Sequence, residues 1–230
     1  PMREIVLDTE TTGFDPFHGD RIVEIGALEL EGHVPTGVQF HEYINPERGM
    51  PNEAFQVHGL GDDFLRDKPK FAQVGQKFLD FIQDSTLIIH NAAFDMKFLN
   101  AELKKIGLPE IPMNRALDTL PMARKKFPGS PASLDALCRR YGITNFERDL
   151  HGALLDSEIL AEVYLELIGG RQPDFGLATT SSSKGGADGG EWKPQPRPNP
   201  LPSRLSEAEA ETHKAYVAKE LGDAALWLKP

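Results

Sequence analysis

The sequence predicts an α/β domain over residues 2–170, with a mixed five-stranded sheet flanked by helices. Three observations support this prediction. The N-terminal part alternates apolar and polar side chains as strands do, and from residue 71 onward helical apolar spacing alternates with short apolar runs. Hydrophobic residues make up 40% of the 230-residue chain, enough to bury a core. A linker and one isolated helix are expected after this domain.

Five strands are expected. The first is a short apolar run that ends at Asp8, and the next two alternate, as half-buried strands of a meander do. The last two are short apolar runs between helices. Their expected positions are residues 3–7, 21–30, 38–44, 86–89 and 116–117.

Five helices are expected where apolar residues recur at spacings of three and four. Asn91 is a natural N-cap for the second of them, and Gly169 and Gly170 close the last. Their expected positions are residues 71–82, 91–106, 118–127, 133–141 and 152–168.

The C-terminal part has a different composition. Residues 171–205 are rich in Gly, Ser and Pro, which predicts a flexible linker. Within 206–230, Ser206 and Glu209 form a capping box that begins a helix expected to run to about Leu221. A lone helix of this size cannot form a core, so its apolar residues need a partner. These apolar residues are Tyr216, Val217, Leu221, Leu226 and Trp227.

The chain is acidic, with 25 Lys and Arg against 35 Asp and Glu and a net charge of −10. A protein of this charge is a poor candidate for tight duplex binding through many phosphates. It can still act on nucleic acid if metal ions or partner proteins supply positive charge.

The composition also bears on the compartment. Cys138 is the one cysteine, which excludes a disulfide framework or a cysteine-based zinc cluster and suits a reducing cytoplasm. No run approaches the 18 or so apolar residues of a membrane span, and the N-terminus lacks a signal pattern. We expect Met2 to be the natural start, no membrane association and a cytoplasmic location.

Four carboxylates stand where apolar residues would be expected. Asp8 and Glu10 share one face at the end of a strand, Asp95 borders the inner face of its helix, and Asp156 heads an apolar stripe. Taken singly, they fit a polar turn, a helix-dipole contact and a salt bridge. Together they indicate a cluster that needs hard divalent cations, Mg²⁺ or Mn²⁺, and a pair of these ions suits phosphoryl transfer. His151, five residues before Asp156, is either a base for an attacking water or a helix-entry residue with a local hydrogen bond.

These residues fall in three ordered motifs. Residues 8–13 (DTETTG), 90–95 (HNAAFD) and 151–156 (HGALLD) resemble the three motifs of the DEDD 3′–5′ exonucleases, the last in its histidine form. Further stretches at 53–59, 123–129 and 133–138 resemble the proofreading epsilon subunits of bacterial DNA polymerase III. The resemblance covers residues 3–170 and implies an RNase H-like fold.

The resemblance implies a role for each catalytic residue. Asp8, Glu10 and Asp156 would hold two divalent cations, with Asp95 supporting the site through water. His151 would deprotonate the attacking water. The reaction would remove misincorporated nucleotides from a single-stranded 3′ end of DNA as nucleoside 5′-monophosphates.

Substrate contacts follow from the same resemblance. Asp8, Glu10 and Asp156 would also face the substrate, while Glu53 and His58 match positions that contact the terminal nucleotide. From the residues alone, Glu53 is equally a helix-start charge and His58 a loop or packing histidine.

Two protein partners are also implied. Residues 206–228 resemble the segment that binds the polymerase (alpha) subunit. Gln172–Leu177 (QPDFGL) resembles a sliding-clamp-binding motif, or is ordinary linker with two apolar residues. Such tethers would raise the local concentration of nuclease at the primer end.

Two other functions remain open at this point. An RNA-trimming exonuclease of the same superfamily would be compact, which the linker and isolated helix disfavour. A non-catalytic replisome scaffold would not need the complete set of acids and histidine.

Overall fold

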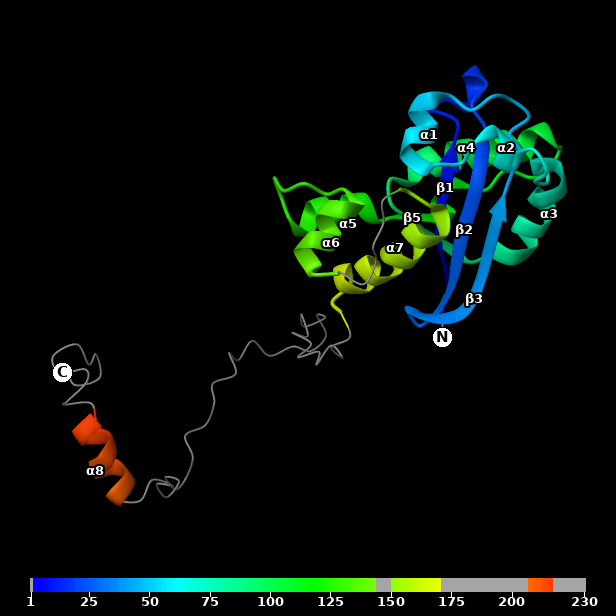
Figure 1. Ribbon diagram of the computed structural model, residues 1–230. Coiled ribbons are helices and arrows are strands. Elements are labelled where there is room, and N and C mark those ends of the chain that lie inside the picture. The colour runs from blue at the N-terminus through cyan, green and yellow to red at the C-terminus, as the bar shows by residue number, and fades with distance from the viewer. Residues whose placement is uncertain (1, 144–149, 171–206, 217–230) are drawn as a thin grey trace, which may run out of the picture. The chain divides into compact units, whose positions relative to one another are not determined.

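The computed structural model describes residues 2–143, 150–170 and 207–216 (Figure 1). These fall into two units, one within residues 1–177 and one within 178–230, and each is treated by itself. The expected linker at 171–205, including Gln172–Leu177, lies outside the described residues. None of the described helices combines the length and the apolar character needed to cross a membrane.

The first unit is built on the predicted five-stranded mixed sheet, in the order β3-β2-β1-β4-β5. β1, β2 and β3 form the antiparallel meander, and β4 and β5 run parallel to β1. The strands are β1 (Arg3–Thr11), β2 (Ile22–Glu31), β3 (Val34–Tyr43), β4 (Thr86–Ile89) and β5 (Ala116–Asp118). β1 is longer than the expected 3–7, because its pairing with β2 continues through Glu10 and Thr11.

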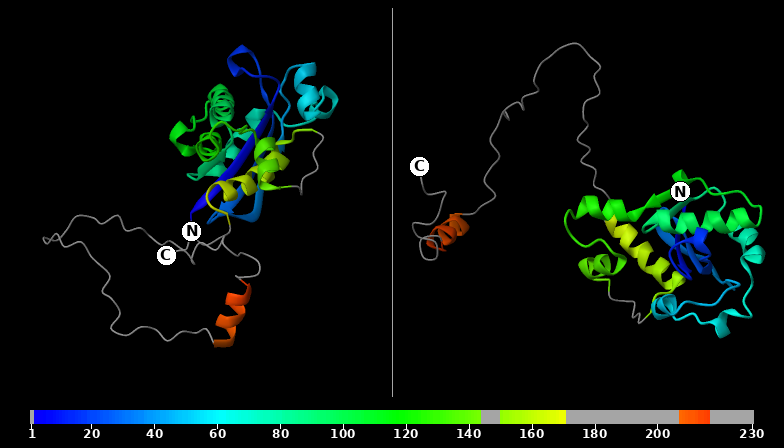
Figure 2. Two further views of the ribbon diagram at one scale, coloured as in Figure 1. Left: turned by 90° about the vertical axis from the view of Figure 1, so that its left-hand side faces the viewer. Right: turned by 90° about the horizontal axis from the view of Figure 1, so that it is seen from above.

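Helices cover both faces of the sheet (Figure 2). Those of the first unit are α1 (Asn52–His58), α2 (Asp62–Leu65), α3 (Phe71–Ile82), α4 (Ala92–Lys105), α5 (Thr119–Lys126), α6 (Leu134–Tyr141) and α7 (Ala153–Leu167). The apolar spacing did not reveal α1 and α2, because each buries a single residue, His58 and Leu65. The other five agree with their expected ranges within one residue at each end.

The alternation along β1 divides the core into two layers. Ile5 and Leu7 pack in the cluster that includes α3 and α4, whereas Val6 packs with Leu160 and Tyr164 of α7. A third cluster joins α5 and α6 to α7. The face of β1 that carries Val6 therefore continues toward α7, and the opposite face toward α4.

The start of α4 differs from the expectation for Asn91. Asn91 occupies the N-cap position with a left-handed backbone (φ 66°), but its side chain caps no backbone N–H group. The carboxylate of Asp118 does so instead, accepting hydrogen bonds from the backbone N–H groups of Asn91 (2.9 Å) and Ala92 (3.0 Å). The cap thus comes from the end of β5, which fixes α4 relative to the sheet.

The second unit contains α8 (Glu207–Tyr216), within the helix expected after Ser206. The remainder of that expected helix lies outside the described residues.

Candidate active site

The carboxyl end of β1 carries the first two predicted acids inside the strand. Asp8 and Glu10 lie on the face that Val6 turns toward α7. Glu10 is 9% exposed. Thr9, between them, turns to the opposite face and contacts α4. Side chains from α7 on one face and from α4 on the other can therefore both reach the carboxyl end of β1.

The first turn of α7 lies directly on β2. Gly26 of β2 stands opposite Asp8, and a side chain there would collide with the backbone of Ala153 and Leu154. The hydroxyl of Ser157 lies 2.8 Å from the Gly26 carbonyl oxygen and can donate to it. This close approach brings the N-terminal end of α7 to the acids of β1.

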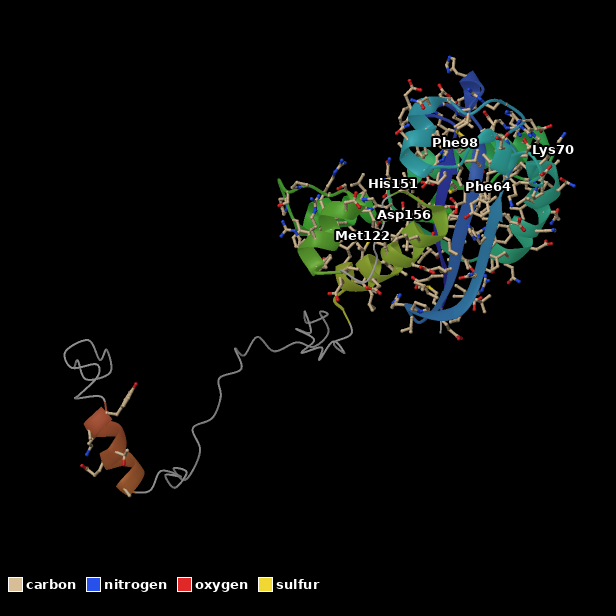
Figure 3. The ribbon with its side chains drawn as sticks, viewed as in Figure 1. Phe64, Lys70, Phe98, Met122, His151 and Asp156 are labelled. Atoms are coloured by element: carbon tan, nitrogen blue, oxygen red, sulfur yellow. The ribbon has the colours of Figure 1, made fainter. Side chains whose placement is uncertain are left out.

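Asp156, in the first turn of α7, and His151, in the loop before it, lie close together (Figure 3). Ligand atoms of Glu10, His151 and Asp156 lie within 4.8 Å of one another. Nδ1 of His151 is 3.2 Å from Oδ2 of Asp156; the histidine side chain is 43% exposed and the aspartate side chain 7%. The backbone N–H of His151 donates to the carbonyl oxygen of Val57 (2.9 Å), which joins this loop to α1.

Asp95 approaches from α4, on the other face of the sheet. Its Oδ1 accepts hydrogen bonds from the backbone N–H (3.1 Å) and the hydroxyl (2.7 Å) of Thr9. Burial raises the pKa of Asp95 to about 7, the Thr9 hydrogen bonds oppose this rise, and the charge of Asp118 adds to it. Asp95 is thus held at a fixed position with a weakened tendency to ionise.

Asp8 stands at the centre of this negative charge. Burial raises its pKa well above the usual range, and the charges of Asp95, Glu10, Asp156 and Glu24 raise it further. Like charges this close are stable together only when protons or cations neutralise them. The oxygen donors fit hard divalent cations, with one imidazole beside them.

The structure therefore brings together all five residues that the sequence assigned to catalysis. They come from β1, α4, α7 and the loop before α7, and together they span more than 140 residues of the chain. They are Asp8, Glu10, Asp95, His151 and Asp156.

Glu24 is a further acid that the sequence analysis missed. It lies opposite Glu10 on β2 and is 3% exposed. Its Oε2 accepts a hydrogen bond from the backbone N–H of Ala153 (3.1 Å), and Nε2 of His41 lies 2.8 Å from its Oε1. The available signal was a charged residue on the strand face that also carries Leu28. Glu24 anchors the first residue of α7 beside the acids.

Glu53 and His58 lie in α1. Glu53 is exposed in the first turn, and His58 is buried at the end. Nδ1 of His58 accepts from the backbone N–H of Leu60 (3.0 Å), so Nε2 carries the proton and donates to the carbonyl oxygen of Thr11 (3.1 Å). Burial lowers the pKa of His58 and favours this neutral form. His58 joins α1 to the end of β1, and the nucleotide contacts of both residues stay predictions.

Known proteins resemble this chain in sequence and in fold. Residues 5–164 match the RNase_T exonuclease family model. The DNA polymerase III subunit epsilon of Rickettsia conorii is 47% identical over 97% of this chain and 98% of its own length. That of Escherichia coli K12 is 51% identical over 74% of this chain and 72% of its own. The solved nuclease domain of 3'hExo, a DEDDh family member bound to rAMP, shares the fold. The two structures superpose with a TM-score of 0.61 at 20% sequence identity. The superposition covers 72% of this chain and 91% of that domain.

Proposed function

Because this chain belongs to the RNase_T exonuclease family and, within it, to the epsilon subunits of DNA polymerase III, we propose that the cluster at the carboxyl end of β1 hydrolyses the 3′-terminal phosphodiester of DNA. The chain is the 3′–5′ exonuclease that proofreads for the polymerase. The observation that carries this function is the convergence of four buried or half-buried carboxylates and one accessible histidine at one end of the sheet. A mispaired terminus enters such a site more readily because it unpairs at lower cost.

Divalent cations are the first requirement. We assign Asp8, Glu10 and Asp156 as the residues that hold two of them, Mg²⁺ or Mn²⁺. The raised pKa of Asp8 and the 4.8 Å cluster around Glu10 and Asp156 support this assignment. When bound, such cations stabilise negative charge on the attacking and leaving oxygens. Asp95, fixed by Thr9, supports the same centre from the α4 side.

His151 is the general base. Its Nδ1 faces the Asp156 carboxylate at 3.2 Å, so a proton on Nδ1 is stabilised there and Nε2 is left as an acceptor. Because 43% of the side chain is exposed, an attacking water can reach it. The water gives its proton to Nε2 as its oxygen bonds to phosphorus, and the bond to the 3′ oxygen of the preceding nucleotide breaks.

Glu53 and His58 belong to the pocket for the terminal nucleotide. Their helix, α1, contacts both β1 and the loop that carries His151. His58 donates a hydrogen bond to the carbonyl oxygen of Thr11, and the carbonyl oxygen of Val57 accepts one from the backbone N–H of His151. A nucleotide bound against α1 therefore lies beside the acids and the base.

Two tethers would deliver the enzyme to DNA. Residues 206–228 bind the polymerase (alpha) subunit, and Gln172–Leu177 is a candidate contact for the sliding clamp. The protein acts in the cytoplasm, where the bacterial chromosome lies. Removing residues 178–230 should abolish co-elution with the polymerase subunit and leave hydrolysis of free oligonucleotides unchanged. Loss of that hydrolysis would place the tail in the catalytic unit.

The activity test is a titration with Mg²⁺ or Mn²⁺ on a 5′-labelled single strand. We expect no cleavage in chelator, stepwise shortening from the 3′ end with either metal, and nucleoside 5′-monophosphates as products. The same strand made of ribonucleotides should be degraded much more slowly. Equal or faster ribonucleotide cleavage would favour RNA trimming, and metal-independent or absent cleavage would contradict the proposal.

A further inference from the structure

The helices α5 and α6, which pack on α7 (Figure 1), concentrate positive charge in an otherwise acidic protein. Residues 119–141 carry five Lys and Arg and one acid, a net charge of +4, whereas the chain as a whole carries −10. All five basic side chains are exposed. They are Arg124, Lys125, Lys126, Arg139 and Arg140, and the one acid is Asp135.

Two open depressions run along this face and share Pro131. The first, of about 510 Å³, is lined by His90, Asn91, Arg124 and the 130–134 segment. The second, of about 540 Å³, is lined by Arg139, Arg140 and Ala136. The two adjoin at Pro131 and are together called the groove, and arginine side chains line both.

The groove begins beside the catalytic cluster. Asn91 follows β4, and its backbone N–H binds Asp118 at the end of β5. The carboxyl ends of β4 and β5 lie at the same edge of the sheet as that of β1, because the three strands are parallel. Asp118 is also near enough to Asp95 to raise its pKa.

The walls of the groove are held in place. Nε2 of His90 donates to the carbonyl oxygen of Ala132 (2.8 Å), and its Nδ1 lies 2.8 Å from the Thr119 hydroxyl. The Arg140 guanidinium lies 4.2 Å from the ring centroid of Phe127. Lys126, by contrast, binds the carbonyl oxygen of Glu166 at the end of α7 (3.0 Å). Arg124 and Arg139 are thus the groove cations best placed to bind a ligand.

We propose that this groove binds the sugar–phosphate backbone of the single strand that leads away from the terminal nucleotide, with Arg124 and Arg139 contacting phosphates. The inference rests on the proposed function, which places the 3′ end at the carboxylates. The rest of the strand must then leave a strongly negative centre, and this groove offers a positive path that starts at its edge. Positively charged grooves follow single strands in this way without reading sequence.

The test uses the full chain, the double variant Arg124→Ala/Arg139→Ala, and Lys125→Ala as the matched control. Lys125 is exposed on the same helix but does not line the groove. Substrates are a dinucleotide, which fills the catalytic centre alone, and a single strand of about 12 nucleotides, within the usual span of such grooves. Arg140 is left intact because it packs on Phe127.

For the double variant we expect KM on the long strand to rise about tenfold with kcat unchanged, and no change on the dinucleotide. The slope of log affinity against log salt should fall by about 0.7 for each phosphate that the variant no longer binds. Lys125→Ala should match wild type. An unchanged KM on the long strand, or an equal effect on both substrates, would overturn the proposal.

Binding of the labelled long strand, measured by fluorescence anisotropy in Ca²⁺, separates this inference from the proposed function. If wild type bound the strand through the two arginines but cleaved neither substrate, the groove would stand and the exonuclease assignment would fail. Wild-type DNA affinity in the double variant, together with weaker binding to the polymerase subunit, would assign the face to a protein and overturn the inference.

Discussion

The two ends of β1 bury carboxylates in opposite ways. At the amino end, Glu4 is 1% exposed and accepts a hydrogen bond from the Tyr164 hydroxyl at 2.6 Å, with Nδ1 of His33 2.7 Å from its other oxygen. At the carboxyl end, on the same face of the strand, Asp8 faces the charges of Asp95, Glu10, Asp156 and Glu24. One carboxylate is surrounded by donors and the other by acids.

The difference separates structural from functional acids better than burial does. Glu102, 2% exposed, belongs to the first kind, because the guanidinium of Arg21 binds both of its oxygens. The attraction within such pairs offsets part of the cost of their desolvation. Burial and the charges of its acidic neighbours raise the pKa of Asp8, so this cluster needs cations from solution. This contrast makes the two ends of β1 respond differently to mutation, pH and metal.

Asp8→Ala should have the largest effect. Removing the central carboxylate should reduce exonuclease activity to background, because the ion-binding set loses the member that faces all the others. The fold should persist, and the metal-free protein should unfold at equal or slightly higher temperature, since charge repulsion is relieved. The measurements are kcat/KM on a single strand and thermal unfolding in chelator. Activity within tenfold of wild type would contradict the assignment of Asp8.

His151→Ala should lower kcat by roughly 10²–10⁴-fold, the usual contribution of a general base. The pH profile of kcat should also differ between wild type and the variant, because the group that accepts the proton of the attacking water is lost. Metal affinity, followed by the Mn²⁺ concentration that gives half-maximal rate, should change much less. A variant with the wild-type pH profile would remove His151 from the chemistry.

Glu24→Gln should have an intermediate effect. The amide oxygen can still accept from Ala153, but the charge that faces His41 is removed, so α7 is held less firmly. We expect a roughly tenfold fall in kcat with KM nearly unchanged, in the range seen when a supporting partner is removed. His41→Phe, which leaves the carboxylate, should lower kcat less. No change in kcat for Glu24→Gln would show that Ala153 needs no charged anchor.

Stability should depend on pH through the acids. Asp95 has an ordinary pKa of 3.8 and a folded value of about 7, so between these values the folded state binds more protons than the unfolded state. Its contribution to stability is present below about pH 4 and is lost as pH rises through 7. The lowered pKa values of His58 and His90 act in the opposite sense as pH rises toward 6.5.

The comparison of wild type with Asp95→Asn isolates the acid, because the amide oxygen keeps the Thr9 contacts. From pH 5 to pH 8 without metal, wild type should lose stability relative to the variant by about 1 kcal/mol or more in urea unfolding. Saturating Mg²⁺ should reduce this loss in wild type. Parallel pH curves for the two proteins would mean that Asp95 ionises normally.

The sequence predicted the sheet and the five main helices because apolar periodicity is local and strong. It also predicted all five residues of the cluster, since an acid at the head of an apolar stripe, such as Asp156, is visible without a structure. It did not reveal Glu24, whose role depends on the position of α7 over Gly26, more than 120 residues away. The Asp118 cap was missed for the same reason. Asn91 has the right residue type at the right place, and only the approach of β5 decides that the Asp118 carboxylate, and not the Asn91 side chain, caps the helix.

The smallest effect on activity is expected at the other end of β1. Glu4→Gln keeps an acceptor for the Tyr164 hydroxyl but removes the charge beside His33, and the added amide N–H group needs an acceptor of its own. Leaving a buried polar group unsatisfied costs about 1–3 kcal/mol, so urea unfolding should show a loss of that size. Exonuclease kcat/KM should stay within twofold of wild type, because no catalytic residue contacts this end. A parallel fall in kcat/KM, at a temperature where the variant is fully folded, would show that α7 transmits changes at Tyr164 to Asp156, and the separation of the two ends would not hold.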